Sequence, residues 1–181
     1  IYIYRDPRDV CLSLQKAPIG PSHYYVISEN VAKQQKIALN LMKTYPLVHT
    51  VRYEFLLQDQ ESQMQLLDQF LTKSVPTHDM SSKVIKPHKW EHSYDKDGIE
   101  LQMVESASWE VMEELGYAPA SLNKREFTAD DIEGFKKRGE EGKEAKSLAL
   151  KTEDFEDWER REKQKEIILR AYQDQLSLIH I

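Results

Sequence analysis

The chain opens with a strand pattern that passes directly into a helix pattern, Ile1-Tyr2-Ile3-Tyr4-Arg5-Asp6-Pro7-Arg8-Asp9-Val10-Cys11-Leu12-Ser13. The β-branched and aromatic residues at the start predict a strand over residues 1–5. Asp6 suits a helix N-cap and Pro7 suits the first helical position, so a helix is expected from about Pro7 to Lys16. Because the run begins inside a strand and without Met, we expect the chain to be the C-terminal part of a longer protein.

Strand and helix patterns alternate beyond this run. Helices are expected over about 22–44, 61–71 and 98–115, a strand over 47–53, and irregular structure over 75–96. Strands separated by long helical crossovers are typical of a parallel α/β sheet. Charged residues are 28 of the first 119 residues and 28 of the last 62. We therefore expect a domain over 1–119 and a charged helical extension over 120–181, with helices near 128–148 and 153–175.

Composition excludes several classes of protein. The 181 residues hold 31 acidic and 25 basic side chains, a net charge of −6, which argues against bulk binding of nucleic acid. No run approaches the ~18 apolar residues of a membrane-spanning helix. The single Cys11 excludes an internal disulfide and a thiolate metal cluster, and is expected to pack in the core rather than to act as a nucleophile. His88 and His92 have helical metal-ligand spacing but lack a third ligand, so no metal site is expected.

Arg5 and Ser13 are the first candidate ligand-binding residues. Arg5 ends the predicted strand on its carboxyl side, where open α/β sheets bind ligands. Ser13 lies two helical turns beyond Asp6, on the same helical face. A guanidinium and a hydroxyl placed in this way can hold one phosphate. The alternative interpretation is an ordinary strand–helix junction with a surface arginine.

The pattern Arg-Asp-Pro-Arg-Asp-x-x-x-Ser over residues 5–13 resembles the 3′-phosphate-binding motif of sulfotransferases that use 3′-phosphoadenosine 5′-phosphosulfate (PAPS). In that family the Arg and the Ser hold the 3′-phosphate, which implies this role for Arg5 and Ser13. Lys16 lies near the place where some members have a further basic contact. The resemblance implies PAPS as co-substrate and no metal.

A second stretch, Val51-Arg52-Tyr53-Glu54-Phe55-Leu56 followed by Leu66-Leu67-Asp68-Gln69-Phe70-Leu71, resembles a strand–helix unit of the same family. Phe55 stands where the family usually has an acidic residue. In the relatives the tyrosine of this unit lies beside the adenosine, so the resemblance implies that role for Tyr53. The alternative is a core tyrosine at the end of a strand.

A third stretch, residues 81–90 with Trp109 to Tyr117, resembles the C-terminal part of tyrosylprotein sulfotransferases and of their carbohydrate-type and bacterial relatives. There a serine-rich loop and a lysine before a tryptophan close over the nucleotide. The donor contacts this implies are Ser81 or Ser82, Lys89, and Lys86 nearby. The alternative is a solvated basic loop.

A competing phosphate motif is present in the extension. Lys137-Arg138-Gly139-Glu140-Glu141-Gly142 resembles the Arg-Lys-Gly-x-x-Gly motif of cytosolic sulfotransferases. The tryptophan that follows in the family is absent and the surroundings are acidic, so a charged helix terminus with glycine stops is the preferred interpretation.

The resemblance covers residues 1–119 and implies a three-layer α/β fold of the P-loop nucleotide-kinase-like type, with a parallel sheet incomplete at its N-terminal side. It implies sulfuryl transfer from PAPS to a hydroxyl acceptor, namely a carbohydrate, a protein tyrosine or a small molecule. The catalytic base and any membrane anchor would lie upstream, so this chain alone is expected to be inactive. Golgi lumen and cytoplasm both remain open. The alternatives are a nucleotide or sugar kinase-like enzyme, although no P-loop motif is present, and a non-catalytic helical interaction protein.

Overall fold

The fold is that of a computed structural model, which describes residues 1–45, 47–72, 88–149, 160 and 163. Helices account for 68% of these residues. The chain divides into two compact units, Ile1–Lys143 and Glu144–Ile181. The packing described below is that of the first unit.

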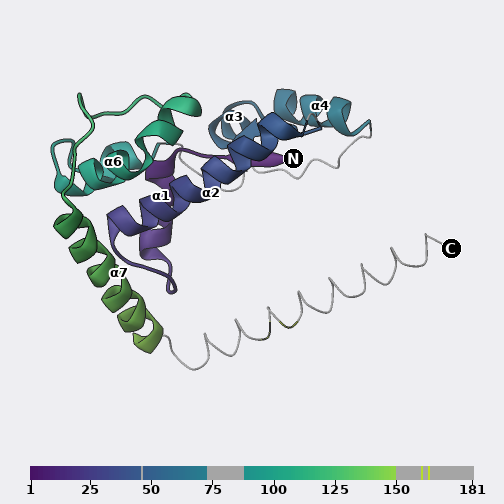
Figure 1. Ribbon diagram of the computed structural model, residues 1–181. Coiled ribbons are helices and arrows are strands. Elements are labelled where there is room, and N and C mark those ends of the chain that lie inside the picture. The colour runs from purple at the N-terminus through teal and green to yellow at the C-terminus, as the bar shows by residue number, and fades with distance from the viewer. Residues whose placement is uncertain (46, 73–87, 150–159, 161–162, 164–181) are drawn as a thin grey trace. The chain divides into compact units, whose positions relative to one another are not determined.

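The elements follow one another in the order shown in Figure 1. They are β1 (Tyr2–Tyr4), α1 (Pro7–Lys16), α2 (Tyr24–Thr44), β2 (Thr50–Arg52), α3 (Tyr53–Gln58), α4 (Gln60–Leu71), α5 (Trp90–Ser93), α6 (Ile99–Glu114) and α7 (Ala129–Ala149). The predicted helices over 7–16, 22–44, 61–71, 98–115 and 128–148 correspond to α1, α2, α4, α6 and α7. The predicted helix over 153–175 lies outside the described residues.

The prediction of a three-layer fold with a parallel sheet is wrong. Within the described residues the sheet consists of β1 and β2 alone, paired in parallel with Ile3 opposite Val51. The predicted strand over 47–53 is reduced to Thr50–Arg52, because the chain turns into α3 at Tyr53. Two strands of three residues are too small to be covered by helical layers on both faces. The helices pack on one another instead.

The core lies where α1, α2 and α6 meet (Figure 1). One apolar cluster joins the three helices and Tyr94, and consists of Cys11, Leu12, Ile27, Val31, Tyr94, Leu101 and Val104. The other lies further along α2 and α6, and consists of Ala32, Leu39, Val111, Met112, Leu115 and Tyr117. Both clusters follow the helical spacing of apolar residues in the sequence. Cys11 is fully buried in the first of them, as its expected packing role requires.

Helix termini carry capping groups, and those predicted for the start of α1 are confirmed. The Asp6 side chain accepts a hydrogen bond from the Arg8 backbone N–H at 2.9 Å, and Pro7 follows at the first helical position. Gly116 adopts a left-handed φ of 74° just after α6, a conformation that favours glycine. Thr128 and Asp131 exchange hydrogen bonds, with the Asp131 N–H donating to Thr128 Oγ1 at 3.1 Å and the Thr128 N–H donating to Asp131 Oδ2 at 3.0 Å.

Helix α7 packs against the start of α2 through a glycine and an aromatic group. A Cβ at Gly139 would lie 3.1 Å from Val26 Cγ2, so the two backbones approach closely only because residue 139 has no side chain. The aromatic group comprises His23, Tyr25, Phe127 and Phe135, with ring centroids 4.8 to 5.7 Å apart in the contacting pairs. Gly139 and Gly142 of the competing phosphate motif both lie inside α7, so the preferred interpretation of them as helix stops is wrong.

Truncating the α2–α6 contact tests this core. Leu101→Ala removes a fully buried side chain and is expected to lower the free energy of unfolding by about 2–5 kcal/mol. Leu122→Ala is the matched control, because Leu122 is 98% exposed, and it should change that free energy by no more than about 0.5 kcal/mol. Urea denaturation measures both. Equal effects of the two variants would contradict the described core.

Cys11 supplies a pH-dependent test of the same core. Burial raises the pKa of the Cys11 thiol to about 12, whereas the pKa of an unfolded cysteine is about 8.5. The unfolded state therefore binds fewer protons above that pH, and the free energy of unfolding should fall by about 1 kcal/mol between pH 8.5 and 9.5. Urea denaturation at the two pH values measures this fall. Cys11→Ala should lack it, and an identical fall in that variant would show that Cys11 is not buried as described.

Candidate functional site at the β1–α1 junction

Arg5 is held between two other side chains where β1 passes into α1. Its Nη2 donates to Asp9 Oδ2 at 2.9 Å, and its guanidinium carbon lies 4.7 Å from the centroid of the Tyr53 ring. The Arg5 side chain is 20% exposed, and its Nε is buried with no hydrogen-bond partner among the described residues. Gln35 Nε2 donates to the Arg5 carbonyl at 3.4 Å. The guanidinium is thus fixed by Asp9 and Tyr53, and its Nε–H is available to a further acceptor.

Arg8, three residues further, is the centre of a buried ion network. Its side chain is 3% exposed. Nε and Nη2 donate to the two carboxylate oxygens of Asp6 at 3.0 and 2.8 Å. Nη1 donates to Glu105 Oε1 at 2.9 Å and to the Ala118 carbonyl at 3.2 Å. Burial acts to lower the pKa of Arg8, but Asp6 and Glu105 outweigh it and the pKa is raised. Arg8 is therefore charged, and it ties α1 to α6.

Two buried glutamates extend this network to other segments. Glu105 accepts the backbone N–H groups of Ala120 and Ser121 at 2.7 and 2.9 Å. Glu54, at the start of α3, accepts the Asp6 N–H at 3.1 Å and the Tyr117 hydroxyl at 2.8 Å. Burial, and then the Glu54 carboxylate, raise the pKa of Tyr117. The start of α3 and the segment after α6 are thereby attached to the junction.

Asp9 connects the junction to the segment around α5. While Oδ2 accepts from Arg5, Oδ1 accepts the Trp90 N–H at 2.9 Å. The Trp90 ring lies 3.6 Å from the guanidinium carbon of Arg8, a cation–π contact. Tyr94 adds a hydrogen bond from its hydroxyl to the Arg8 carbonyl at 3.4 Å. Residues 90–94 are therefore attached to the first turn of α1.

The structure brings together some of the residues predicted for the donor site. Arg5 and Tyr53 are in contact, and Lys89 is the exposed residue next to Trp90. Ser13 is exposed on α1, one turn beyond Asp9 and on the same side of the helix. Lys16 is exposed at the C-terminal end of α1. Ser81, Ser82 and Lys86 lie outside the described residues.

Sequence reasoning missed the residues that hold the junction together. Asp9 and Trp90 occur only as parts of the sequence motifs, and Glu105 lies in none of them. One signal could have found Glu105: it stands inside the apolar stripe of α6, between Val104 and Ser108, both of which are buried. A glutamate at such a position needs a buried partner.

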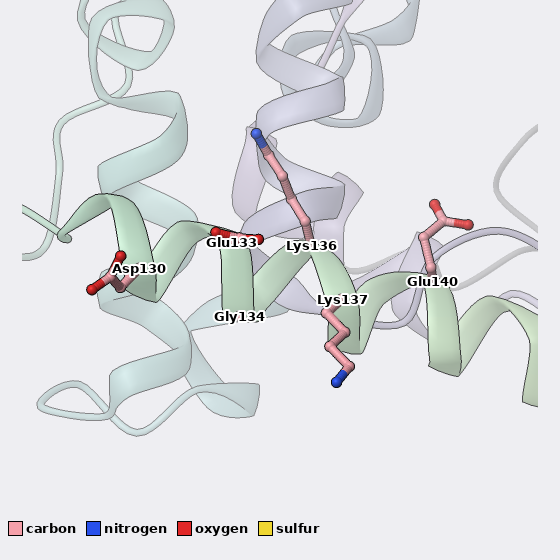
Figure 2. Close-up of a pocket in the computed structure, with 6 residues that line it drawn as sticks. All are labelled: Asp130, Glu133, Gly134, Lys136, Lys137 and Glu140. Atoms are coloured by element: carbon pink, nitrogen blue, oxygen red, sulfur yellow. The ribbon is translucent and has the colours of Figure 1, made fainter.

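Metal-binding groups and membrane-spanning helices are absent from the described part of the chain. No group of three or more His, Cys, Asp or Glu side chains among those residues could hold a metal ion. None of the described helices combines the length and the apolar character needed to cross a bilayer. A shallow depression on α7 is lined by Asp130, Glu133, Gly134, Lys136, Lys137 and Glu140. Figure 2 shows Lys136 and Lys137 extending to opposite sides of the helix, so these charges do not converge on a ligand.

Comparisons with known proteins add no assignment, because no protein-family model, no curated protein and no solved structure matches this chain.

The buried network predicts very different effects for two glutamates on α6. Glu105→Gln removes one partner of the buried Arg8 charge and is expected to lower the free energy of unfolding by about 3–5 kcal/mol. Glu110→Gln is the matched control, because Glu110 is exposed and pairs with Lys36 and Lys124 at the surface. It should cost no more than about 1 kcal/mol. Urea denaturation at pH 7 measures both, and a mild effect of Glu105→Gln would contradict the network.

Proposed function

We propose that this chain supplies the 3′-phosphate end of a PAPS site and takes part in sulfuryl transfer to a hydroxyl acceptor. One observation carries the proposal: the Arg5 guanidinium is fixed between the Asp9 carboxylate and the Tyr53 ring. Arg5 and Asp9 come from the stretch that resembles the 3′-phosphate motif of sulfotransferases, and Tyr53 comes from the stretch that resembles their adenosine-binding unit.

The environment of Arg5 supports an anionic ligand. One edge of the guanidinium is used by Asp9, and Nε has no partner among the described residues. A buried N–H without an acceptor is unfavourable by about 1–3 kcal/mol, and a phosphate oxygen would satisfy it after a small rearrangement. Ser13 offers an exposed hydroxyl one turn beyond Asp9. Arg5 and Ser13 would therefore hold the 3′-phosphate, with Tyr53 beside the adenosine.

The chemistry requires little more of this part of the protein than position and positive charge. In sulfuryl transfer, the sulfur–oxygen bond to the nucleotide breaks and a new bond forms to the acceptor oxygen, whose proton is taken up by a base. We assign no residue of this chain as that base. Anchoring the 3′-phosphate with Arg5 fixes the donor relative to the acceptor and discriminates PAPS from simple adenylates.

The proposal rests on local geometry, since the three-layer fold implied by the resemblance is not present in the described residues. The kinase-like alternative depends on that same fold and gains no support. The helical architecture favours a second candidate, a non-catalytic interaction protein, because α2, α6 and α7 form a helical assembly without a sheet-based ligand cleft in the described range. Binding of the nucleotide distinguishes the two candidates.

Calorimetric titration with 3′-phosphoadenosine 5′-phosphate tests the proposal. Arg5→Ala should weaken binding at least about tenfold, because it removes a charge-assisted phosphate contact of about 1.5–3 kcal/mol. The same variant should leave the affinity for adenosine 5′-phosphate unchanged. Lys137→Ala, which removes an exposed cation on α7, is the control and should have no effect. Absence of binding, or equal affinity of the wild type and Arg5→Ala for the bisphosphate, would favour the interaction protein.

A further inference from the structure

We infer that Asp9 is a positioning residue that aligns Arg5 and the segment carrying Lys89 on the same 3′-phosphate, an inference that rests on the proposed function. The Asp9 side chain is 0% exposed, and each of its carboxylate oxygens accepts a hydrogen bond. One holds the Arg5 guanidinium and the other holds the backbone N–H of Trp90, and these two residues are 85 positions apart in sequence.

The two bonds set a short distance between these segments. Each is 2.9 Å long, so Arg5 Nη2 and the Trp90 nitrogen are no more than about 8 Å apart. Lys89 immediately precedes Trp90 and is exposed. Its side chain therefore starts within reach of a phosphate bound at Arg5, and its backbone position depends on the same carboxylate.

Asp9 does not suit direct contact with the ligand. A carboxylate repels a phosphate, and this one is fully buried whereas the Arg5 side chain paired with it is 20% exposed. Its negative charge lowers the attraction of the junction for anions. Asp9 aids binding because it holds the Arg5 guanidinium in one orientation, so that less side-chain entropy is lost when the phosphate binds. This gain must exceed the electrostatic cost of the Asp9 charge.

The segment has other attachments to α1, which allows Asp9 to be changed without detaching it. Trp90 packs on the Arg8 guanidinium at 3.6 Å, and the Tyr94 hydroxyl donates to the Arg8 carbonyl. Asp9→Asn keeps the shape of the side chain and one carbonyl oxygen that can accept the Trp90 N–H. It removes the charge that fixes Arg5.

The experiment measures the 3′-phosphate preference, defined as the Kd for adenosine 5′-phosphate divided by the Kd for 3′-phosphoadenosine 5′-phosphate. A general loss of structure would weaken both ligands equally and leave this ratio unchanged. Asp9→Asn is expected to lower the preference about fivefold or more, and to have no further effect when added to Arg5→Ala. Asp59→Asn is the matched control: Asp59 is an exposed N-cap of α4, and Asn caps equally well.

Lys89→Ala provides a second variant that leaves the core untouched. Lys89→Ala should lower the 3′-phosphate preference of the wild type. The same substitution should lower the preference less in an Arg5→Ala background, because both cations act on one phosphate. An unchanged or increased preference in Asp9→Asn, with Arg5→Ala still effective, would show that Asp9 competes for Arg5 and would overturn the inference alone. Strictly additive effects of Lys89→Ala and Arg5→Ala would also overturn it. An ineffective Arg5→Ala would overturn the proposed function and this inference with it.

Discussion

Arg8 carries a positive charge into the interior of the first unit, where its side chain is 3% exposed. A charge buried in this way costs several kcal/mol unless it is paired and its donors are satisfied. Asp6 and Glu105 provide the pairing, and the Ala118 carbonyl accepts a further bond. Because these partners come from α1, α6 and the segment after α6, the network can be satisfied only when all three are correctly placed. The network therefore specifies how these three segments are arranged around Arg8.

The candidate site lies at the edge of this network. Arg5 is partly exposed and is held by Asp9, whose second oxygen binds the segment around α5. Glu54, which accepts the Asp6 N–H, is the neighbour of Tyr53, and Tyr53 in turn contacts the Arg5 guanidinium. Buried, hydrogen-bonded side chains thus hold more accessible ones in place, as is expected of a site whose ligand contacts must keep their orientation. The side chains best placed for a ligand are those next to the buried charges rather than the buried charges themselves.

The sequence predicted the five longest described helices well, missed the short helices α3 and α5, and predicted the sheet poorly. Apolar spacing, together with Asp6 and Pro7 at the start of α1, marked these helix positions to within a few residues, because these signals are local. The run after Leu47 has strand composition, yet only Thr50–Arg52 pairs with β1, since pairing depends on a partner strand that local sequence does not reveal. Arg5 and Tyr53 could be proposed from motifs, but their contact joins residues 48 positions apart in sequence. The burial of Arg8 and the role of Asp9 likewise arise from tertiary contacts, and three candidates, Ser81, Ser82 and Lys86, lie outside the described residues.

The close approach of α7 to α2 at Gly139 also affects how easily α7 separates from the rest of the first unit. Between Ala129 and Lys143, only Phe135 and Gly139 are buried, and the Ser22 side chain occupies the space beside Gly142. Three residues spaced four and three apart form one narrow stripe along the helix. A helix attached by so little apolar surface has a low free energy of local opening. Its amide protons should therefore exchange with deuterium sooner than those of α2 or α6, and together, as a separate cooperative unit.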